Sequence, residues 1–193
     1  MSGTDATSVY WNRRYEPWAI KQDKVIKTAL KAKGLDVRSF NAGLLREPWA
    51  ISTQKGEPYK VFTPFWKALR ALGEQDQSLP APALIPAPSN FPQSDELGSW
   101  GLLPEAPDWA EGLRDTWTPG EQAAYSRLED FTESAVFDYQ TMRNFPGVSG
   151  TSRLSPHLHF GEVGPRQIWN AVAISAVVND IERTKEEDRR LRR

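Results

Sequence analysis

The sequence contains no cysteine and only two histidines among its 193 residues. Without cysteine the chain can form neither disulfide bonds nor thiolate zinc sites, and two histidines without a cluster of further ligands do not indicate a metal centre. No apolar run approaches the roughly 18–20 residues that a membrane-crossing helix needs. Residues 1–9 lack the basic and apolar regions of a signal peptide, so we expect a soluble, cytoplasmic protein.

The chain also lacks an excess of charge of one sign, because 24 basic residues stand against 25 acidic ones. This balance excludes a protein that binds nucleic acid through bulk positive charge, so any such contact must be local. Aromatic residues are plentiful, with eight Trp, eight Phe and five Tyr. Proteins use such a surplus either in cores or in stacking against flat ligands.

Charge and proline divide the chain into three blocks. Residues 1–72 carry 13 basic and 6 acidic side chains, residues 73–119 carry 1 and 8, and residues 120–193 carry 10 and 11. The middle block also holds eight of the fifteen prolines, and proline fixes φ and removes a backbone donor, so we expect no regular structure there. The sequence therefore predicts a domain over 1–72, an interdomain linker over 73–117 and a second domain over 118–193.

The first block reads as strand, helix, strand. Residues 8–11 form a short β-like run, residues 15–33 have helical periodicity, and residues 37–40 form a second β-like run. This order predicts a parallel pair with a right-handed crossover, which belongs to the α/β class. A further helix is predicted from Thr63 as its N-cap, with Pro64 at the first helical position.

The third block reads as all-α. Thr118 and Glu121 have the spacing of a capping box and open an amphipathic pattern that breaks near Phe131. Pro165 opens a second helical pattern that ends in a charged run over 182–193, which we interpret as a solvated helix end. The fold class predicted for the whole chain is therefore α/β followed by all-α.

One segment between these two helical patterns concentrates groups that bind anions. Thr151, Ser152 and Ser155 supply hydroxyls and Arg153 a guanidinium, directly before an expected helix start. Hydroxyls, a cation and free amides at the start of a helix favour an anion, and a diphosphate is the natural guest. The same residues are also ordinary helix caps, with Gly150 as a turn residue, so the residues alone leave both interpretations open.

The order of residues in this region resembles a known family. Residues 139–161, which end in TSRLSPHLHFG, and residues 164–169 closely resemble the flavin-diphosphate segment of the DNA photolyase and cryptochrome family. Residues 9–17 and 61–66 resemble the antenna domain of the same family, in the same order. The resemblance covers nearly the whole chain and is closest to the class I bacterial cyclobutane pyrimidine dimer photolyases.

The resemblance specifies the fold class further. It implies an internal fragment made of the C-terminal part of a Rossmann-like parallel-sheet antenna domain, a long Pro-rich linker and the start of a helical FAD-binding domain. The cofactor it implies is FAD. The residues that match the family's flavin-phosphate contacts are Tyr139, Thr151, Ser152, Leu154 and Ser155.

Two arginines have alternative interpretations. Arg143 matches a family residue near the DNA backbone, although it is equally suited to a surface ion pair with Asp138. Arg153 lies inside the cofactor motif, and its guanidinium can point to a phosphate or to a carboxylate such as Glu162.

The histidines and two of the tryptophans are interpreted structurally. His157 and His159 are two residues apart, so they face different sides of a helix, and we expect neither catalysis nor metal binding from them. Trp66 and Trp169 fit apolar helix faces and are expected in the core instead of a redox relay.

The activity implied by the resemblance is light-driven repair of cyclobutane pyrimidine dimers in DNA by a flavoprotein lyase, a monomer when full length, with damaged DNA as its partner. The alternatives are a cryptochrome-type blue-light receptor and a truncated remnant without catalysis. Family members also carry a folate or deazaflavin antenna. Folate-binding members have an Asn-Glu pair where this chain has Trp18 and Ala19, so folate is not expected here.

Overall fold

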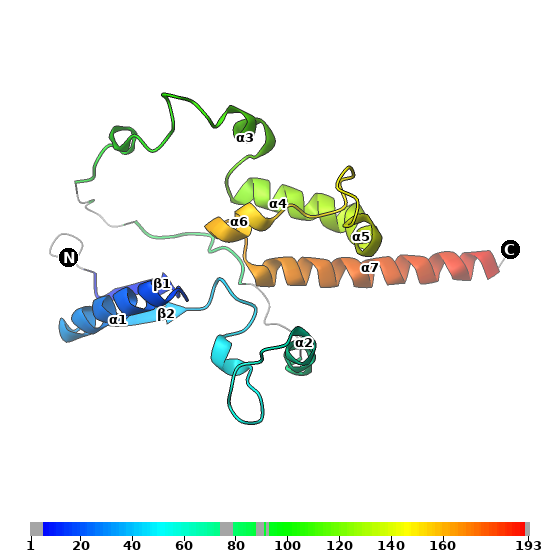
Figure 1. The fold of residues 1–193 in the computed structure, drawn as a ribbon, viewed down its shortest axis with the longest axis horizontal. Helices are drawn as coiled ribbons and strands as arrows, with labels where there is room; N and C mark the ends of the chain where they lie inside the picture. Colours follow the sequence, from blue (N-terminus) through cyan, green and yellow to red (C-terminus); the bar gives the residue numbers. More distant parts are fainter. Residues whose placement is uncertain (1–5, 74–78, 88–90, 92, 192–193) are drawn as a thin grey trace. The chain divides into compact units, whose positions relative to one another are not determined.

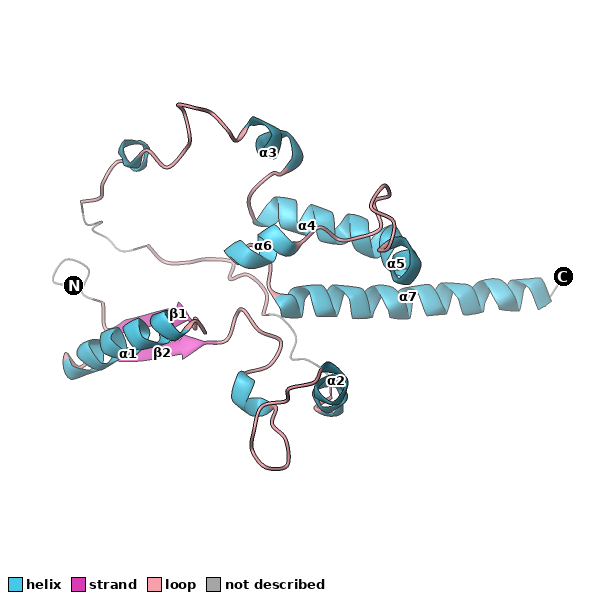
Figure 2. Ribbon diagram, in the orientation of Figure 1, coloured by secondary structure: helices cyan, strands magenta, loops and turns pink. Residues whose placement is uncertain are grey.

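The computed structural model describes residues 6–73, 79–87, 91 and 93–191. The chain divides into two compact units, one made of residues 1–40 and 80–119 and the other of residues 41–79 and 120–193. Figures 1 and 2 show the elements of both units. The three-part domain division expected from composition stays a prediction.

The first unit contains the predicted strand, helix and strand. Strand β1 (Ser8–Asn12) and strand β2 (Asp36–Phe40) pair in parallel, in a register that joins Ser8 to Asp36 and Asn12 to Phe40. Helix α1 (Pro17–Ala32) connects them and lies along the sheet in Figure 2, with Ala19 fully buried. The α/β prediction for this block is confirmed.

The proline-rich block is less irregular than its composition predicts. A 3-10 turn, η2, covers Leu97–Trp100, and a short helix, α3, covers Glu111–Thr116. Both form in stretches between prolines. Asp108 stabilises the start of α3, because its Oδ1 accepts a hydrogen bond from the backbone N–H of Ala110 at 3.1 Å and its carboxylate pairs with Arg114. The expectation of no regular structure is therefore wrong for these two segments.

The second unit is helical, as predicted for the third block. Its helices, in chain order, are η1 (Pro48–Ala50), α2 (Phe62–Ala71), α4 (Glu121–Asp130), the π-helical turn η3 (Phe131–Ala135), α5 (Val136–Met142), α6 (Ser155–Phe160) and α7 (Pro165–Leu191). Figure 1 shows that α7 extends well past α4 and α6. Trp66 of α2 contacts Trp169 of α7 edge to face, with ring centroids 6.1 Å apart, so α2 packs with these helices.

Two predicted helix caps are wrong. Helix α2 begins at Phe62 with Val61 as its N-cap, so Thr63 already lies inside the helix. Helix α4 begins at Glu121 with Gly120 as its N-cap, and no side chain at the cap position closes its first turn, so Thr118 does not cap it. The cap of α4 comes from far along the chain, because the Glu162 carboxylate accepts the Gly120 N–H at 2.8 Å.

The predicted break near Phe131 is confirmed as the π-helical turn η3, which joins α4 to α5. In a π-turn the backbone hydrogen bonds run from i to i+5, and such turns are frequent at functional sites. Ser175 of α7 donates a hydrogen bond from its hydroxyl to the carbonyl oxygen of Thr132 at 2.7 Å. Helix α7 therefore supports the backbone at the point where the helix widens.

The core of the helical unit is small and lies between α4 and the segment around α6. Its buried members are Ala124, Leu128, Leu154 and Val163, and Ile168 and Ala171 pack against them. Leu154 lies inside the predicted cofactor motif, so that motif is fixed to the core by one of its own residues.

The loop after α5 turns back on the end of that helix and is closed by Gly150. A Cβ atom at Gly150 would lie 2.6 Å from the Cβ and 2.7 Å from the carbonyl carbon of Met142. Real Cβ atoms essentially never come that close to other atoms. Only glycine therefore allows residue 150 to lie against α5, immediately before the hydroxyl-rich segment.

We expect Gly150→Ala to destabilise the chain by about 1–3 kcal/mol, because the backbone must shift to relieve this overlap. The free energy of unfolding from urea titration measures the effect. Gly147→Ala is the matched control in the same loop, since a Cβ there meets nothing within 4 Å. Equal stability of the two variants would contradict the packing described here.

Candidate functional site

The hydroxyl-rich segment runs from the Gly150 turn into α6. Thr151 and Ser155 are exposed, Ser152 is half-buried and Leu154 is buried. The segment thus turns Leu154 into the core and leaves the exposed Thr151 and Ser155 available to a ligand. This arrangement agrees with the anion-site interpretation, although simple capping by these hydroxyls would leave them exposed as well.

Arg153 has an uncommon backbone conformation. Its φ is +51°, and it is the one non-glycine residue with positive φ among the described residues. Leu154, which follows, is right-handed at φ −88° and ψ −2°. Successive residues of opposite hand turn their N–H groups towards one concave side, the backbone geometry called a nest, which binds anions. A left-handed non-glycine residue costs of the order of 1–3 kcal/mol and persists only where its surroundings impose it, which is typical of functional sites.

Tyr139 and Arg143 lie one helical turn apart and contact each other. The Arg143 guanidinium carbon lies 5.6 Å from the centre of the Tyr139 ring, a cation–π contact, and the Tyr139 ring meets Phe131 edge to face at 5.9 Å. Tyr139 belongs to α5, whose last residue, Met142, lies against Gly150. The structure therefore brings the start of the hydroxyl-rich segment to the end of the helix that carries Tyr139.

His157 is buried, and only 2% of it is exposed. Its Nδ1 lies 2.5 Å from Oε2 of Glu162, while Oε1 of the same carboxylate accepts the Gly120 N–H. His159 is exposed, so the two histidines do face different sides. Glu162, which the sequence offered as one carboxylate that Arg153 could face, pairs with His157 in the structure.

A second side-chain contact holds the start of α7. The Gln167 side-chain oxygen accepts the N–H of Gly164 at 2.6 Å, and its amide nitrogen donates to the Tyr125 hydroxyl of α4. Burial is the main cause that raises the pKa of Tyr125. The segment from 150 to 164 is thus fixed at its beginning by Gly150 and at its end by Glu162 and Gln167.

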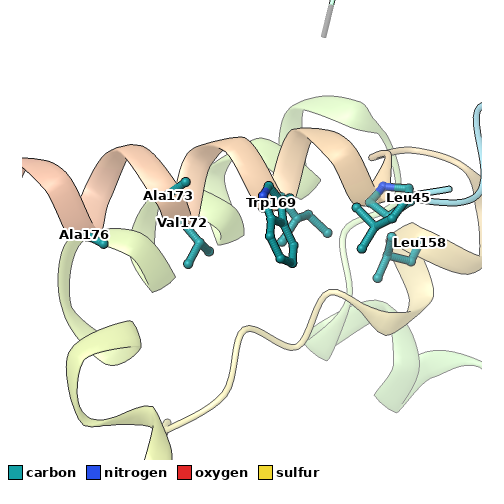
Figure 3. A pocket seen from close by; sticks show the side chains of 8 residues that line it. Leu45, Leu158, Trp169, Val172, Ala173 and Ala176 are labelled. Carbon is teal, nitrogen blue, oxygen red and sulfur yellow. The ribbon is translucent and has the colours of Figure 1, made fainter. Parts of the chain in front are cut away.

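An apolar pocket of about 450 Å³ lies beside the first turns of α7. Figure 3 shows Leu158 from α6, Leu45 from the loop after β2, and Trp169, Val172, Ala173 and Ala176 from α7 around it. All of its lining residues are apolar, so it lacks the donors that a phosphate group requires. The expectation that Trp66 and Trp169 lie in the core is met only in part, because both are half-buried and neither belongs to the buried cluster.

Sequence reasoning missed the two supporting residues, Glu162 and Gln167. Gln167 could have been predicted from local sequence, because a glutamine three residues after Gly164 has the spacing of a capping box. Glu162 could not, because its partner Gly120 lies 42 residues away.

The described part of the chain contains neither a candidate membrane span nor a candidate metal cluster. None of its helices combines the length and the apolar character that spanning a bilayer requires. Nor do three or more of its His, Asp or Glu side chains gather into a metal-binding group.

Comparison with known proteins finds similarity to DNA photolyases and cryptochromes. Residues 1–86 match the family model for DNA photolyase. The chain is 43% identical over 190 residues to a deoxyribodipyrimidine photo-lyase of Agrobacterium fabrum, which covers 97% of this chain and 40% of the relative. It is 34% identical over 187 residues to cryptochrome-1 of Arabidopsis thaliana, which covers 92% of this chain and 26% of that relative. The chain therefore spans less than half the length of these relatives.

Solved structures agree with the fold. The chain superposes on the crystal structure of a bacterial class III photolyase from Agrobacterium tumefaciens with a TM-score of 0.85 and 43% identity, over 94% of this chain and 38% of that one. A cryptochrome from Synechocystis shares the fold, with a TM-score of 0.61 and 21% identity, over 89% of this chain and 36% of that one. The fold of the chain is that of photolyase structures, with a small parallel sheet followed by helices. The expected closeness to class I is not supported, because the photolyase structure at 43% identity is described as class III.

The Glu162 contacts predict a pH dependence of stability. The hydrogen bond from His157, and after it that from the Gly120 N–H, lower the pKa of the Glu162 carboxyl below its ordinary value of 4.5. A lowered folded-state pKa stabilises the fold fully above the unfolded-state value, and this contribution is lost as the pH falls through the folded-state value. We expect Glu162→Gln to remove this part of the acid destabilisation, measured by urea midpoints from about pH 7 to about pH 3.5.

Glu129→Gln is the control for this measurement. Glu129 is exposed on α4, and its substitution removes the same charge. We expect it to keep the acid sensitivity of the unsubstituted chain. If Glu162→Gln kept that sensitivity as well, the Glu162 contacts would not stabilise the fold in the way described.

Proposed function

We propose that the chain is part of a class III DNA photolyase and that residues 139–155 hold the diphosphate of FAD. The observation that carries the proposal is the backbone at Arg153 and Leu154, where residues of opposite hand follow each other inside the hydroxyl-rich segment. The similarity to a deoxyribodipyrimidine photo-lyase along 97% of the chain supports the reaction class. The activity is light-driven repair of cyclobutane pyrimidine dimers.

The residues present fit the phosphate end of FAD. The turned backbone supplies N–H donors, Thr151, Ser152 and Ser155 supply hydroxyl donors, and Arg153 supplies a positive charge for a dianionic group. Tyr139, on the helix that abuts Gly150, is a further phosphate contact. When bound, FAD supplies the light-driven redox chemistry, and this part of the protein holds and orients it.

Damaged DNA is the proposed macromolecular partner, with Arg143 at its backbone. Arg143 is exposed, and its stacking on Tyr139 holds the guanidinium beside the cofactor segment. A guanidinium fixed in this way pairs with phosphate at a lower entropic cost than a free surface side chain. The contact is local, in keeping with the balanced charge of the whole chain.

A cryptochrome-type light receptor is the second candidate, because the chain is also 34% identical to cryptochrome-1 of Arabidopsis thaliana. Both candidates use the same cofactor segment, so only the reaction separates them. Loss of pyrimidine dimers from DNA under blue light identifies a photolyase, and flavin binding without repair identifies the receptor. The antenna chromophore, the cytoplasmic location and the monomeric state stay predictions, as does the alternative of a non-catalytic remnant.

The cofactor assignment is tested in a photolyase-length hybrid, in which this chain replaces the matching 40% of the Agrobacterium relative. We expect Ser152→Ala with Ser155→Ala to raise the FAD dissociation constant at least about tenfold, because two donors to a charged group are lost. Flavin retained after gel filtration measures the effect. Ser126→Ala, on the exposed surface of α4, is the control and is expected to keep its flavin. Unchanged flavin content in the double variant would contradict the diphosphate assignment.

The DNA assignment is tested with the same hybrid and a duplex that contains one pyrimidine dimer. We expect Arg143→Gln to reduce the slope of log affinity against log salt by about 0.9, the value for one lost phosphate contact. Lys67→Gln removes an exposed cation from α2 and is the control for a general charge effect. Equal slopes for Arg143→Gln and the unsubstituted hybrid would exclude a phosphate contact by this residue.

A further inference from the structure

Helix α6 needs external support to hold its orientation. It has six residues, Ser155–Phe160, and helices this short are not stable by themselves in water. Leu154 and His157 are three residues apart and face the interior together, each only 2% exposed. Ser155, between them, is exposed. The rotation of α6 about its axis therefore decides where the Ser155 hydroxyl lies.

His157 fixes that rotation through a polar contact. Its Nδ1 lies 2.5 Å from Oε2 of Glu162. A carboxylate offers only acceptors, so Nδ1 carries the proton and donates it. Hydrogen bonds to an ionised group are roughly twice as strong as neutral ones. The imidazole is thus held by a directional bond as well as by packing.

Glu162 carries this constraint to a different helix. Its Oε1 accepts the N–H of Gly120 at 2.8 Å, at the start of α4, and its own backbone N–H donates to the carbonyl of His157 at 2.9 Å. Both its backbone and its side chain are therefore tied to α6, while its second oxygen is tied to α4. One residue therefore links α6 to the start of α4.

We propose that His157 and Glu162 are positioning residues for the cofactor. The chain of contacts from His157 through Glu162 to Gly120 fixes the rotation of α6, and so holds Ser155 and the left-handed Arg153 in the arrangement that binds a diphosphate. This inference rests on the proposed function. It also explains how the uncommon backbone at Arg153 is maintained, because Leu154 and His157 anchor the chain directly after it.

His157 could act by packing or by donating a hydrogen bond, and the two roles predict opposite results. Packing alone predicts that His157→Leu binds FAD better than His157→Asn, and donation predicts the reverse. Leu fills nearly the volume of imidazole but donates nothing, whereas Asn is smaller and places an N–H close to the position of Nδ1. In the photolyase-length hybrid we expect His157→Asn to bind FAD within about threefold of the unsubstituted protein, and His157→Leu to bind at least about tenfold more weakly. The FAD dissociation constant, measured by flavin fluorescence, gives this order directly.

Glu162→Gln is the second variant, a substitution of nearly equal volume at a half-buried residue. Its amide oxygen still accepts the Gly120 N–H, but the charge that holds His157 is lost, so we expect FAD binding to weaken about tenfold. Glu129→Gln, which removes the same charge from the exposed face of α4, is expected to bind as the unsubstituted hybrid does. If His157→Leu does not fold, Glu162→Gln alone decides the test.

The outcomes separate the two proposals. If the unsubstituted hybrid retains no FAD, the proposed function fails and the positioning role fails with it. If the hybrid retains FAD but His157→Leu binds as well as His157→Asn, or Glu162→Gln binds as the unsubstituted protein does, the positioning role alone is overturned. Weak binding by His157→Leu and Glu162→Gln, together with retention by His157→Asn, supports it.

Discussion

One carboxylate, that of Glu162, connects the parts of the helical unit that the apolar core alone holds weakly. The buried core there consists of Ala124, Leu128, Leu154 and Val163, which is little apolar surface for so many helices. Directional hydrogen bonds must therefore contribute much of the precision with which α4 and α6 meet. Gln167 provides a second link of the same kind, between the start of α7 and Tyr125 of α4. The hydroxyl-rich segment lies between these links and the close contact at Gly150.

Local sequence patterns predicted the elements that depend on local interactions. The parallel pair of β1 and β2 with its connecting helix followed from periodicity alone, and the π-turn after α4 was visible as a break in an amphipathic pattern. The caps at Thr63 and Thr118 were predicted wrongly. At α4 the reason is physical: a carboxylate 42 residues away accepts the N–H of Gly120, so the local hydroxyl is not needed. Helix α3 escaped prediction because composition was averaged over a block whose prolines are unevenly spaced.

Part of the candidate site could also be predicted from the sequence, because its hydroxyl-bearing residues are close together in the chain. Thr151, Ser152 and Ser155 stand together in the sequence, so their shared chemistry is apparent without a structure. The link through Glu162 depends on a contact with Gly120 at the start of α4. Neither this link nor the left-handed backbone of Arg153 could be predicted from spacing. The motif also could not distinguish between photolyase classes, because the classes of one family share the same motif. The proposal of class III rests instead on the similarity to a structure described as class III.

The π-turn over Phe131–Ala135 makes the length of this helix as important as its composition. An α-helix turns by roughly 100° per residue, so a wider turn changes the direction of every side chain that follows. A relative of the same length that continued here as an unbroken α-helix would present its tyrosine on a different side. An alignment without a gap at this turn therefore pairs residues that no longer occupy equivalent places, even where the letters on both sides agree.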